Sequence, residues 1–254
     1  MSVRPRERLE SALRSNGVPT LVSFLTAGYP DKERFREHLR AVAAASDAVE
    51  IGVPFTDPMA DGVTIQRSSH EALKQGVNLQ WILAELTALA PLPTPLLLMS
   101  YLNPLLAFGY QKLSAAAAAA GVCGCIVPDL PLDESADLKA ALDRHGLGLV
   151  QMVTPVTPPE RLARLCAASQ GFVYAVTMTG TTGKSSTVPG DVTQYLDRVR
   201  AAARVPVCAG FGIRSREQVE KLRGHVDGVI VGSALVEVLE RGEDPGAWLA
   251  RLRV

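Results

Sequence analysis

Short apolar segments alternate with longer segments of helical periodicity along almost the whole chain of 254 residues. Most of the apolar segments are nearly continuous, which is typical of parallel strands covered on both faces. They predict strands at Leu21–Thr26, Ala48–Val53, Leu96–Tyr101, Val122–Val127, Leu147–Val153, Phe172–Thr177, Val205–Ala209 and Gly228–Val231. Eight such strands joined by helices predict a closed (β/α)8 TIM barrel, and an open doubly wound sheet is the competing architecture. The even spacing of the strands, with no GxGxxG after any of them, favours the barrel.

The segments between the strands have helical periodicity and several helix-start signals. They predict helices over Asp31–Ala45, Asn78–Ala90, Leu132–Arg144, Pro158–Ala168, Asp191–Ala203 and Ser215–Arg223. The long interval after the second strand leaves room for an extra helix near Thr64–Gln75, and Arg6–Ser15 predicts an N-terminal helix that closes the barrel floor. Because no change in composition marks a linker, we predict a single barrel domain over residues 1–254.

Charge and cysteine patterns narrow the class of protein. The 26 basic and 26 acidic residues cancel, and no Lys/Arg-rich run occurs, so neither nucleic acid nor an anionic membrane surface is an expected partner. No apolar run is long enough to span a membrane, and the first residues lack the apolar core of a signal peptide. The four cysteines have no zinc spacing, so we expect buried free thiols in a cytoplasmic protein.

One strand carries a carboxylate where an apolar residue is the rule. Glu50 lies within the second predicted strand, and the loop that follows carries Asp57 and Asp61 among prolines and an Asp-Gly turn. A carboxylate in apolar surroundings has an unfavourable free energy or a raised pKa. Two acids on one rim suit general acid–base catalysis. The alternative is an acid that caps a loop, followed by ordinary Asp-Pro and Asp-Gly turns.

Glycines after the last two strands indicate a phosphate site. Gly210–Gly212 follows the seventh strand, and Gly232 with Ser233 follows the eighth and opens a helix. In barrels of this kind these loops and a helix N-terminus commonly bind phosphate through backbone N–H groups. Residues at or near other strand ends could form a slot for a flat aromatic ring; they are Phe24, Met99, Tyr101, Ile126, Pro128, Val153, Tyr174 and Phe211.

Missing residue types also discriminate between reactions. No predicted strand contains a lysine, which disfavours a Schiff-base aldolase, and the four histidines show no HxH or HExxH spacing, so we expect no metal site. These patterns favour acid–base chemistry without a cofactor on an aromatic or apolar phosphate ester.

The segment Glu50–Gly62 (EIGVPFTDPMADG) closely resembles the signature of the tryptophan synthase alpha chain family. The resemblance spans nearly the whole chain in order, with further matches at Phe24–Pro30, Met99–Pro104, Val127–Pro131, Gly180–Gly183, Gly210–Ile213 and Gly232–Ala234. It implies a (β/α)8 barrel that cleaves indole-3-glycerol phosphate into indole and glyceraldehyde 3-phosphate.

The resemblance also implies roles for individual residues. Glu50 and Asp61 match the catalytic pair, and Tyr174 and Thr182 match residues that assist the site. The phosphate-binding positions correspond to Gly183, Gly212, Gly232 and Ser233. Glu50 is then expected to shuttle a proton between indole C3 and the glycerol hydroxyl, while an ionised Asp61 acts at the indole N–H.

Such alpha chains pair with a pyridoxal-phosphate beta chain, which receives the indole through a tunnel and makes tryptophan. The resemblance therefore implies an alpha2beta2 heterotetramer, no cofactor in this chain, and a beta-facing surface at Pro54, Asp57, Asn103 and Asp129. Three alternatives stay open: another phosphate-binding barrel of amino-acid biosynthesis, a stand-alone indole-3-glycerol-phosphate lyase, and a non-catalytic alpha-like activator of a partner.

Overall fold

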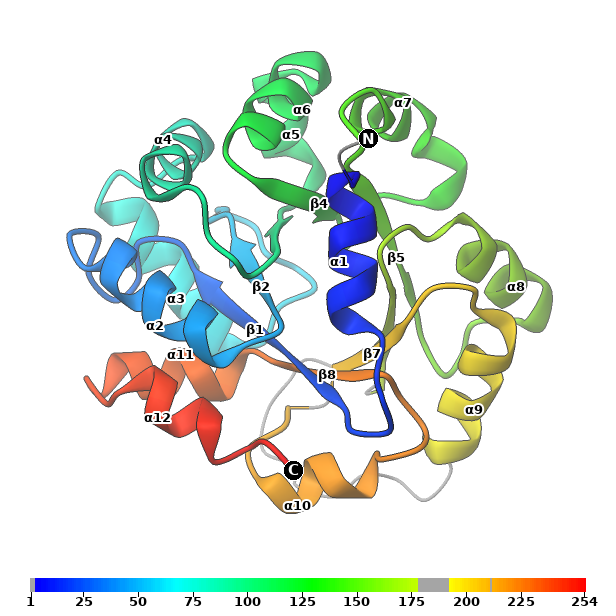
Figure 1. Ribbon diagram of the computed structural model, residues 1–254. Helices are drawn as coiled ribbons and strands as arrows, with labels where there is room; N and C mark the ends of the chain where they lie inside the picture. The colour runs from blue at the N-terminus through cyan, green and yellow to red at the C-terminus, as the bar shows by residue number, and fades with distance from the viewer. Residues whose placement is uncertain (1–2, 178–191, 211) are drawn as a thin grey trace.

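The computed structural model describes residues 3–177, 192–210 and 212–254, and eight parallel strands in this part of the chain form a closed barrel (Figure 1). Each strand pairs with the next in sequence, and the last returns to pair with the first. The strands are β1 (Thr20–Thr26), β2 (Ala48–Gly52), β3 (Leu96–Met99), β4 (Val122–Ile126), β5 (Gly148–Val153), β6 (Val173–Val176), β7 (Val207–Gly210) and β8 (Gly228–Val231). The predicted (β/α)8 barrel is confirmed, and the doubly wound sheet is excluded.

Helices surround the barrel on all sides in Figure 1. They are α1 (Pro5–Leu13), α2 (Phe35–Ala45), α3 (Val63–Lys74), α4 (Leu79–Leu89), α5 (Leu102–Phe108), α6 (Tyr110–Ala119), α7 (Ala136–Asp143), α8 (Pro159–Ala168), α9 (Val192–Ala202), α10 (Arg216–Lys221), α11 (Ser233–Glu240) and α12 (Pro245–Ala250). The extra helix predicted after the second strand is α3, and it begins and ends one residue earlier than expected.

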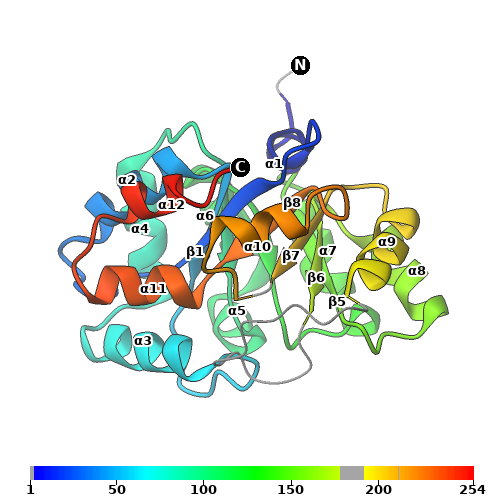
Figure 2. The ribbon, with the colours of Figure 1, turned by 90° about the horizontal axis from the view of Figure 1, so that it is seen from below.

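The N-terminal helix α1 closes one end of the barrel, as predicted. Its Leu9 and Leu13 are fully buried and pack inside the barrel with Leu97 and Phe172. In Figure 2, α1 lies at the top of the molecule and α3, which follows the carboxyl end of β2, lies at the bottom. The carboxyl ends of the strands are therefore the open end of the barrel.

Two helices between β3 and β4 were not predicted. The helices α5 and α6 are short and meet at Gly109, and α6 is so rich in alanine that it has no marked apolar stripe. Periodicity is a weak signal for such segments. The third strand also ends at Met99 rather than Tyr101, because Tyr101 is the N-cap of α5.

The alternation of side chains along β2 directs Glu50 toward the interior of the barrel. Val49 and Ile51 are fully buried in the layer between the strands and the helices, whereas Ala48 packs in the inner cluster. Because successive side chains of a strand point to opposite faces, Glu50 points inward with Ala48. Its strand neighbours in the register are Phe24 on β1 and Leu97 on β3.

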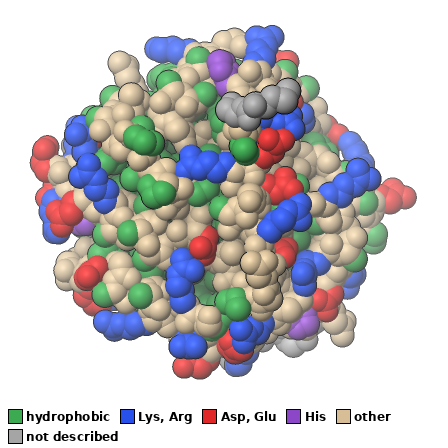
Figure 3. All heavy atoms as spheres, viewed as in Figure 1, with side chains coloured by type: hydrophobic (Ala, Val, Ile, Leu, Met, Phe, Trp, Pro, Cys, Tyr) green, Lys and Arg blue, Asp and Glu red, His purple; other side chains and the backbone are tan. Residues whose placement is uncertain are grey.

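Acidic and basic side chains are interspersed over the face that carries α1 (Figure 3). At the two ends of α1, its N-cap Arg4 pairs with Glu7 and its C-cap Arg14 pairs with Glu10. All four cysteines are buried free thiols, as predicted. Among the described residues, no helix is long and apolar enough to cross a membrane.

Candidate active site

A cavity of about 430 Å³ opens at the carboxyl ends of the strands. Both acids predicted to act together line it: Glu50 from β2 and Asp61 from the loop between β2 and α3. The other walls are Phe24, Ala60, Ile65, Met99, Pro128, Met152, Thr154, Tyr174, Val176, Gly210, Gly212, Ile230, Gly232 and Ser233. The cavity therefore collects residues from widely separated parts of the sequence at the end where barrel enzymes place their chemistry.

Glu50 is fully buried, and neither of its carboxyl oxygens has a hydrogen-bond partner within the described residues. Burial disfavours the charged form and raises the pKa of Glu50 from 4.5 to about 8. The carboxyl group is therefore mostly protonated at neutral pH. A protonated acid that faces a cavity is able to give its proton to a bound molecule.

Asp61 has a different environment. Tyr101 Oη donates a hydrogen bond to its Oδ2 at 3.0 Å, and Gln66 Nε2 donates to its carbonyl oxygen at 2.9 Å. Burial raises the pKa of Asp61 from 3.8 to about 6, while the bond from Tyr101 acts in the opposite direction. At neutral pH this carboxylate is mostly ionised, so one cavity holds a protonated acid and an ionised one.

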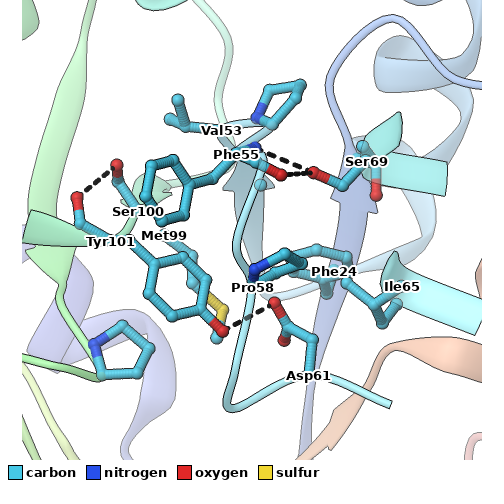
Figure 4. A pocket seen from close by; sticks show the side chains of 14 residues that line it. Phe24, Val53, Phe55, Pro58, Asp61, Ile65, Ser69, Met99, Ser100 and Tyr101 are labelled. Atoms are coloured by element: carbon cyan, nitrogen blue, oxygen red, sulfur yellow. Dashed lines mark hydrogen bonds between the residues drawn. The ribbon is translucent and has the colours of Figure 1, made fainter. Parts of the chain in front are cut away.

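Tyr101 connects the loop between β2 and α3, which carries Asp61, to neighbouring elements (Figure 4). Its hydroxyl accepts a hydrogen bond from the Ala60 backbone N–H at 2.9 Å while it donates to Asp61, and its ring stacks on Phe55 with centroids 5.3 Å apart. The Oγ of Ser69 on α3 bonds to both the N–H and the carbonyl of Phe55, at 2.8 and 3.0 Å. These contacts fix the position of Asp61 relative to β3 and α3.

The part of the cavity lined by the loops after β7 and β8 has the features of an anion site. Gly232 is the N-cap of α11, and Ser233 begins that helix, whose first N–H groups lack intrahelical acceptors. Gly212 has φ +61°, a left-handed conformation that favours glycine, and no atom of the described residues lies within 4 Å of the point where a side chain would begin. Backbone N–H groups, a helix N-terminus and the Ser233 hydroxyl can together bind phosphate without a basic side chain.

The structure brings only part of the predicted ring slot to the cavity. Phe24, Met99, Pro128 and Tyr174 line it, whereas Tyr101 lines an adjoining recess. Ile126 and Val153 are fully buried in the core and are not among the lining residues.

The β5 residue that reaches the cavity is Met152, which the sequence analysis missed. Alternation along the strand points Met152 inward and Val153 outward, so the expectation was displaced by one residue. Thr154 and Val176, also at strand ends, are further lining residues that were not anticipated.

The family model for the tryptophan synthase alpha chain matches residues 11–253. The chain belongs to the tryptophan synthase alpha chain family. The alpha chain of Nitratidesulfovibrio vulgaris (strain DP4) is 44% identical over 251 residues, covering 98% of each chain. That of Chloroflexus aurantiacus (strain ATCC 29364 / DSM 637 / Y-400-fl) is 41% identical over 232 residues, covering 90% of this chain and 87% of the relative.

Solved structures agree with this assignment. Mycobacterium tuberculosis tryptophan synthase matches with a TM-score of 0.87 at 36% identity, over 98% of this chain and 95% of that one. Tryptophan synthase subunit alpha of Legionella pneumophila str. Paris matches with a TM-score of 0.87 at 30% identity, over 99% of this chain and 97% of that one. As a tryptophan synthase alpha chain family member, the protein is a lyase of tryptophan biosynthesis.

Four positions were expected to face the family's beta chain. Asp57, Asn103 and Asp129 are exposed at the rim, and Asp129 Oδ1 accepts a hydrogen bond from the Leu102 N–H at 2.8 Å, at the start of α5. Pro54 is buried instead and lines the recess behind Tyr101.

Three predicted site residues of the alpha chain, Thr182, Gly183 and Phe211, lie outside the described residues. In the part of the chain that is described, no group of three or more His, Cys, Asp or Glu side chains could hold a metal ion.

Proposed function

We propose that this chain cleaves indole-3-glycerol phosphate by a retro-aldol reaction, which releases indole and glyceraldehyde 3-phosphate. The observation that carries the proposal is the pair of carboxyl groups in one cavity, with the pKa of Glu50 raised to about 8 and that of Asp61 to about 6. Membership of the tryptophan synthase alpha chain family supports the choice of substrate.

In this mechanism Glu50 is the acid that protonates indole C3. Protonation converts the ring into an electron acceptor, so that the bond between C3 and the glycerol carbon can break. The glycerol hydroxyl on that carbon loses its proton as the aldehyde forms, and the Glu50 carboxylate, now ionised, takes it. The acid ends the cycle in its starting state, which is favoured because the carboxyl group is buried and has no hydrogen-bond partner among the described residues.

Asp61 acts on the ring nitrogen in the same step. Protonation at C3 places positive charge on the indole nitrogen, and an ionised carboxylate near the N–H stabilises that charge or accepts its proton. One oxygen of Asp61 accepts the bond from Tyr101, so the other is available to the substrate. The apolar walls for the ring come from Phe24, Met99 and Met152. The sulfur atoms of the two methionines suit contact with the edges of an aromatic ring.

The phosphate is assigned to Gly212, Gly232 and Ser233, which line the same cavity as Asp61. Binding at this remote group holds the reacting carbon against Glu50, and the binding free energy can then lower the barrier of the chemical step. Tyr174 also lines the cavity. Its burial, and to a smaller extent the nearby charges of Glu50 and Asp61, raise the pKa of its hydroxyl well above the usual value, so it acts as a neutral phenol.

We further propose that indole passes to a pyridoxal-phosphate beta chain, in an alpha2beta2 heterotetramer, through the rim that carries Asp57, Asn103 and Asp129. A structural neighbour of this chain is tryptophan synthase of Mycobacterium tuberculosis in an aminoacrylate-bound form. This chain needs no cofactor for its own reaction in the proposed mechanism. The four buried free thiols support action in the reducing cytoplasm.

The test is the release of indole from indole-3-glycerol phosphate by the purified chain, with and without a tryptophan synthase beta chain. Slow release alone and a large increase with the beta chain are expected. Rapid release by the chain alone would instead identify a stand-alone lyase. No release in either case would refute the proposed reaction.

A further inference from the structure

A small recess, whose lining residues are drawn in Figure 4, adjoins the cavity at Asp61. The two spaces share walls at Phe24, Asp61, Ile65, Met99 and Pro128. The recess holds about 20 Å³, which is on the order of one water molecule or one methyl group. Neither Glu50 nor the phosphate-site residues line it, so it lies away from the bond that breaks.

The recess offers mainly apolar surface, although several polar residues surround it. The Tyr101 hydroxyl is engaged with Asp61 and Ala60, and Ser69 Oγ bonds to both the N–H and the carbonyl of Phe55. Ser100 Oγ donates to the Tyr101 carbonyl at 2.9 Å. Because these hydroxyl groups are engaged with protein groups, and the free oxygen of Asp61 is assigned to the ring N–H, a polar group placed here would find few partners, whereas an apolar group would be well accommodated.

The apolar part of the wall depends on a close approach between two strands. A side chain on Gly52 of β2 would begin 2.4 Å from the ring of Phe24, so the ring can lie against β2 only because that position is glycine. Val53 continues the wall beyond Gly52. The shape of the recess therefore depends on the packing of β1 against β2 at Phe24 and Gly52.

The order of atoms in indole indicates which position of the ring faces this space. In the proposed function C3 is at Glu50 and the ring N–H is at Asp61. On the side of the N–H away from C3, the nitrogen is bonded to the ring-fusion carbon C7a, and the first carbon there that can carry a substituent is its neighbour C7. A substituent on C7 therefore points past Asp61, where the recess opens.

We propose, on the basis of the function proposed above, that this recess receives a small apolar substituent on C7 of the indole ring. The chain would then accept 7-methylindole-3-glycerol phosphate as a substrate beside the unsubstituted compound. A 7-hydroxyl group, which needs hydrogen-bond partners, would be accepted less well than a 7-methyl group.

The experiment compares kcat/KM for the unsubstituted and the 7-methyl substrates in the wild-type chain and in two matched variants. Val53→Ile adds one methylene to the wall of the recess, and Val176→Ile makes the same change on a wall of the cavity outside the recess. We expect the wild-type value for the 7-methyl substrate to lie within about threefold of the unsubstituted value, since a methyl group matches the size of the recess. Overpacking in Val53→Ile should lower the ratio of kcat/KM for the 7-methyl substrate to kcat/KM for the unsubstituted substrate by about tenfold. Val176→Ile should leave this ratio unchanged.

The ratio separates this proposal from general damage to the protein, which affects both substrates. Ser100→Thr, which keeps the hydroxyl and adds a methyl group to another wall, provides the same test if Val53→Ile does not fold. The proposal is overturned if the wild type cleaves the unsubstituted substrate but not the 7-methyl one, or if filling the recess leaves the ratio unchanged. Failure to cleave the unsubstituted substrate would instead refute the proposed function.

Discussion

Removing the hydroxyl of Tyr101 should change the pH at which the enzyme works. In Tyr101→Phe the carboxylate of Asp61 loses the hydrogen bond of 3.0 Å that favours its ionised form. A hydrogen bond to a charged group contributes about 1.5–3 kcal/mol, and one pKa unit corresponds to about 1.4 kcal/mol. The pKa of Asp61 should therefore rise by about one to two units, from about 6 to about 7–8.

The assay is kcat/KM for indole release between pH 5 and 9 (a range of about four units around the two pKa values). In the wild type, activity should rise as Asp61 ionises near pH 6 and fall as Glu50 ionises near pH 8. Tyr101→Phe should move the acid limb up by about one to two pH units and leave the alkaline limb in place.

Tyr195→Phe is the matched control, because it removes a buried hydroxyl on α9 that has no hydrogen-bond partner in the described part of the chain. Its profile should superimpose on that of the wild type. If Tyr101→Phe also superimposes on the wild type, Tyr101 does not control the protonation of Asp61 and the reasoning is wrong.

Three further changes probe the acid, the ring walls and the phosphate site. Glu50→Gln should lower kcat by about 10²–10⁴-fold. Because folding raises the pKa of Glu50 from 4.5 to about 8, the free energy of unfolding of the wild type should fall by up to about 5 kcal/mol between pH 4.5 and 8. Urea unfolding should show that Glu50→Gln removes this dependence of stability on pH. Met152→Ala should raise KM, because Met152 lines the cavity. Val153→Ala should instead lower the free energy of unfolding by about 2 kcal/mol without a change in KM, because Val153 is buried in the core. The opposite pattern would contradict the assigned directions of these side chains. Ser233→Asp should raise KM about tenfold or more through repulsion of the phosphate. The control is Ser215→Asp, which places the same charge at the N-cap of α10, and steady-state kinetics should show no such rise in KM if the effect is specific to α11.

The barrel could be predicted because its signal is repeated. Eight apolar runs with helices between them have few other solutions, and small errors at the ends of strands do not change the closure. The acid in β2 stood out for the same reason: a carboxyl group within a buried strand is rare, and Glu50 is indeed fully buried. The catalytic roles of Glu50 and Asp61 stay predictions until they are measured.

Side-chain direction was harder to predict than strand position. Residues next to one another in a strand point to opposite faces, so an error of one residue exchanges the cavity for the core, as with Met152 and Val153. Ile126 also belongs to the inner core of the barrel rather than the lining of the cavity. The alternation of β5 would have identified Met152 if its register had been known.

Contacts between distant loops could not be predicted from a single sequence. The bond from Tyr101 to Asp61 joins residues 40 positions apart, and it forms because β3 ends at Met99 and releases Tyr101 to the N-terminus of α5. The end of β3 and the two short helices that follow have weak periodic signals. The control of the Asp61 pKa by Tyr101 was therefore visible only in the structure.

The central claim is that Glu50 and Asp61 share one cavity but differ in protonation at neutral pH. Infrared difference spectra of the wild type against Glu50→Gln, recorded across a pH titration, would measure the protonation of Glu50 directly. We expect the carbonyl band of a protonated carboxyl group at pH 7, with its loss centred near pH 8. A carboxylate signal from Glu50 at pH 7, with no protonated band until the pH falls to about 4.5, would contradict the account.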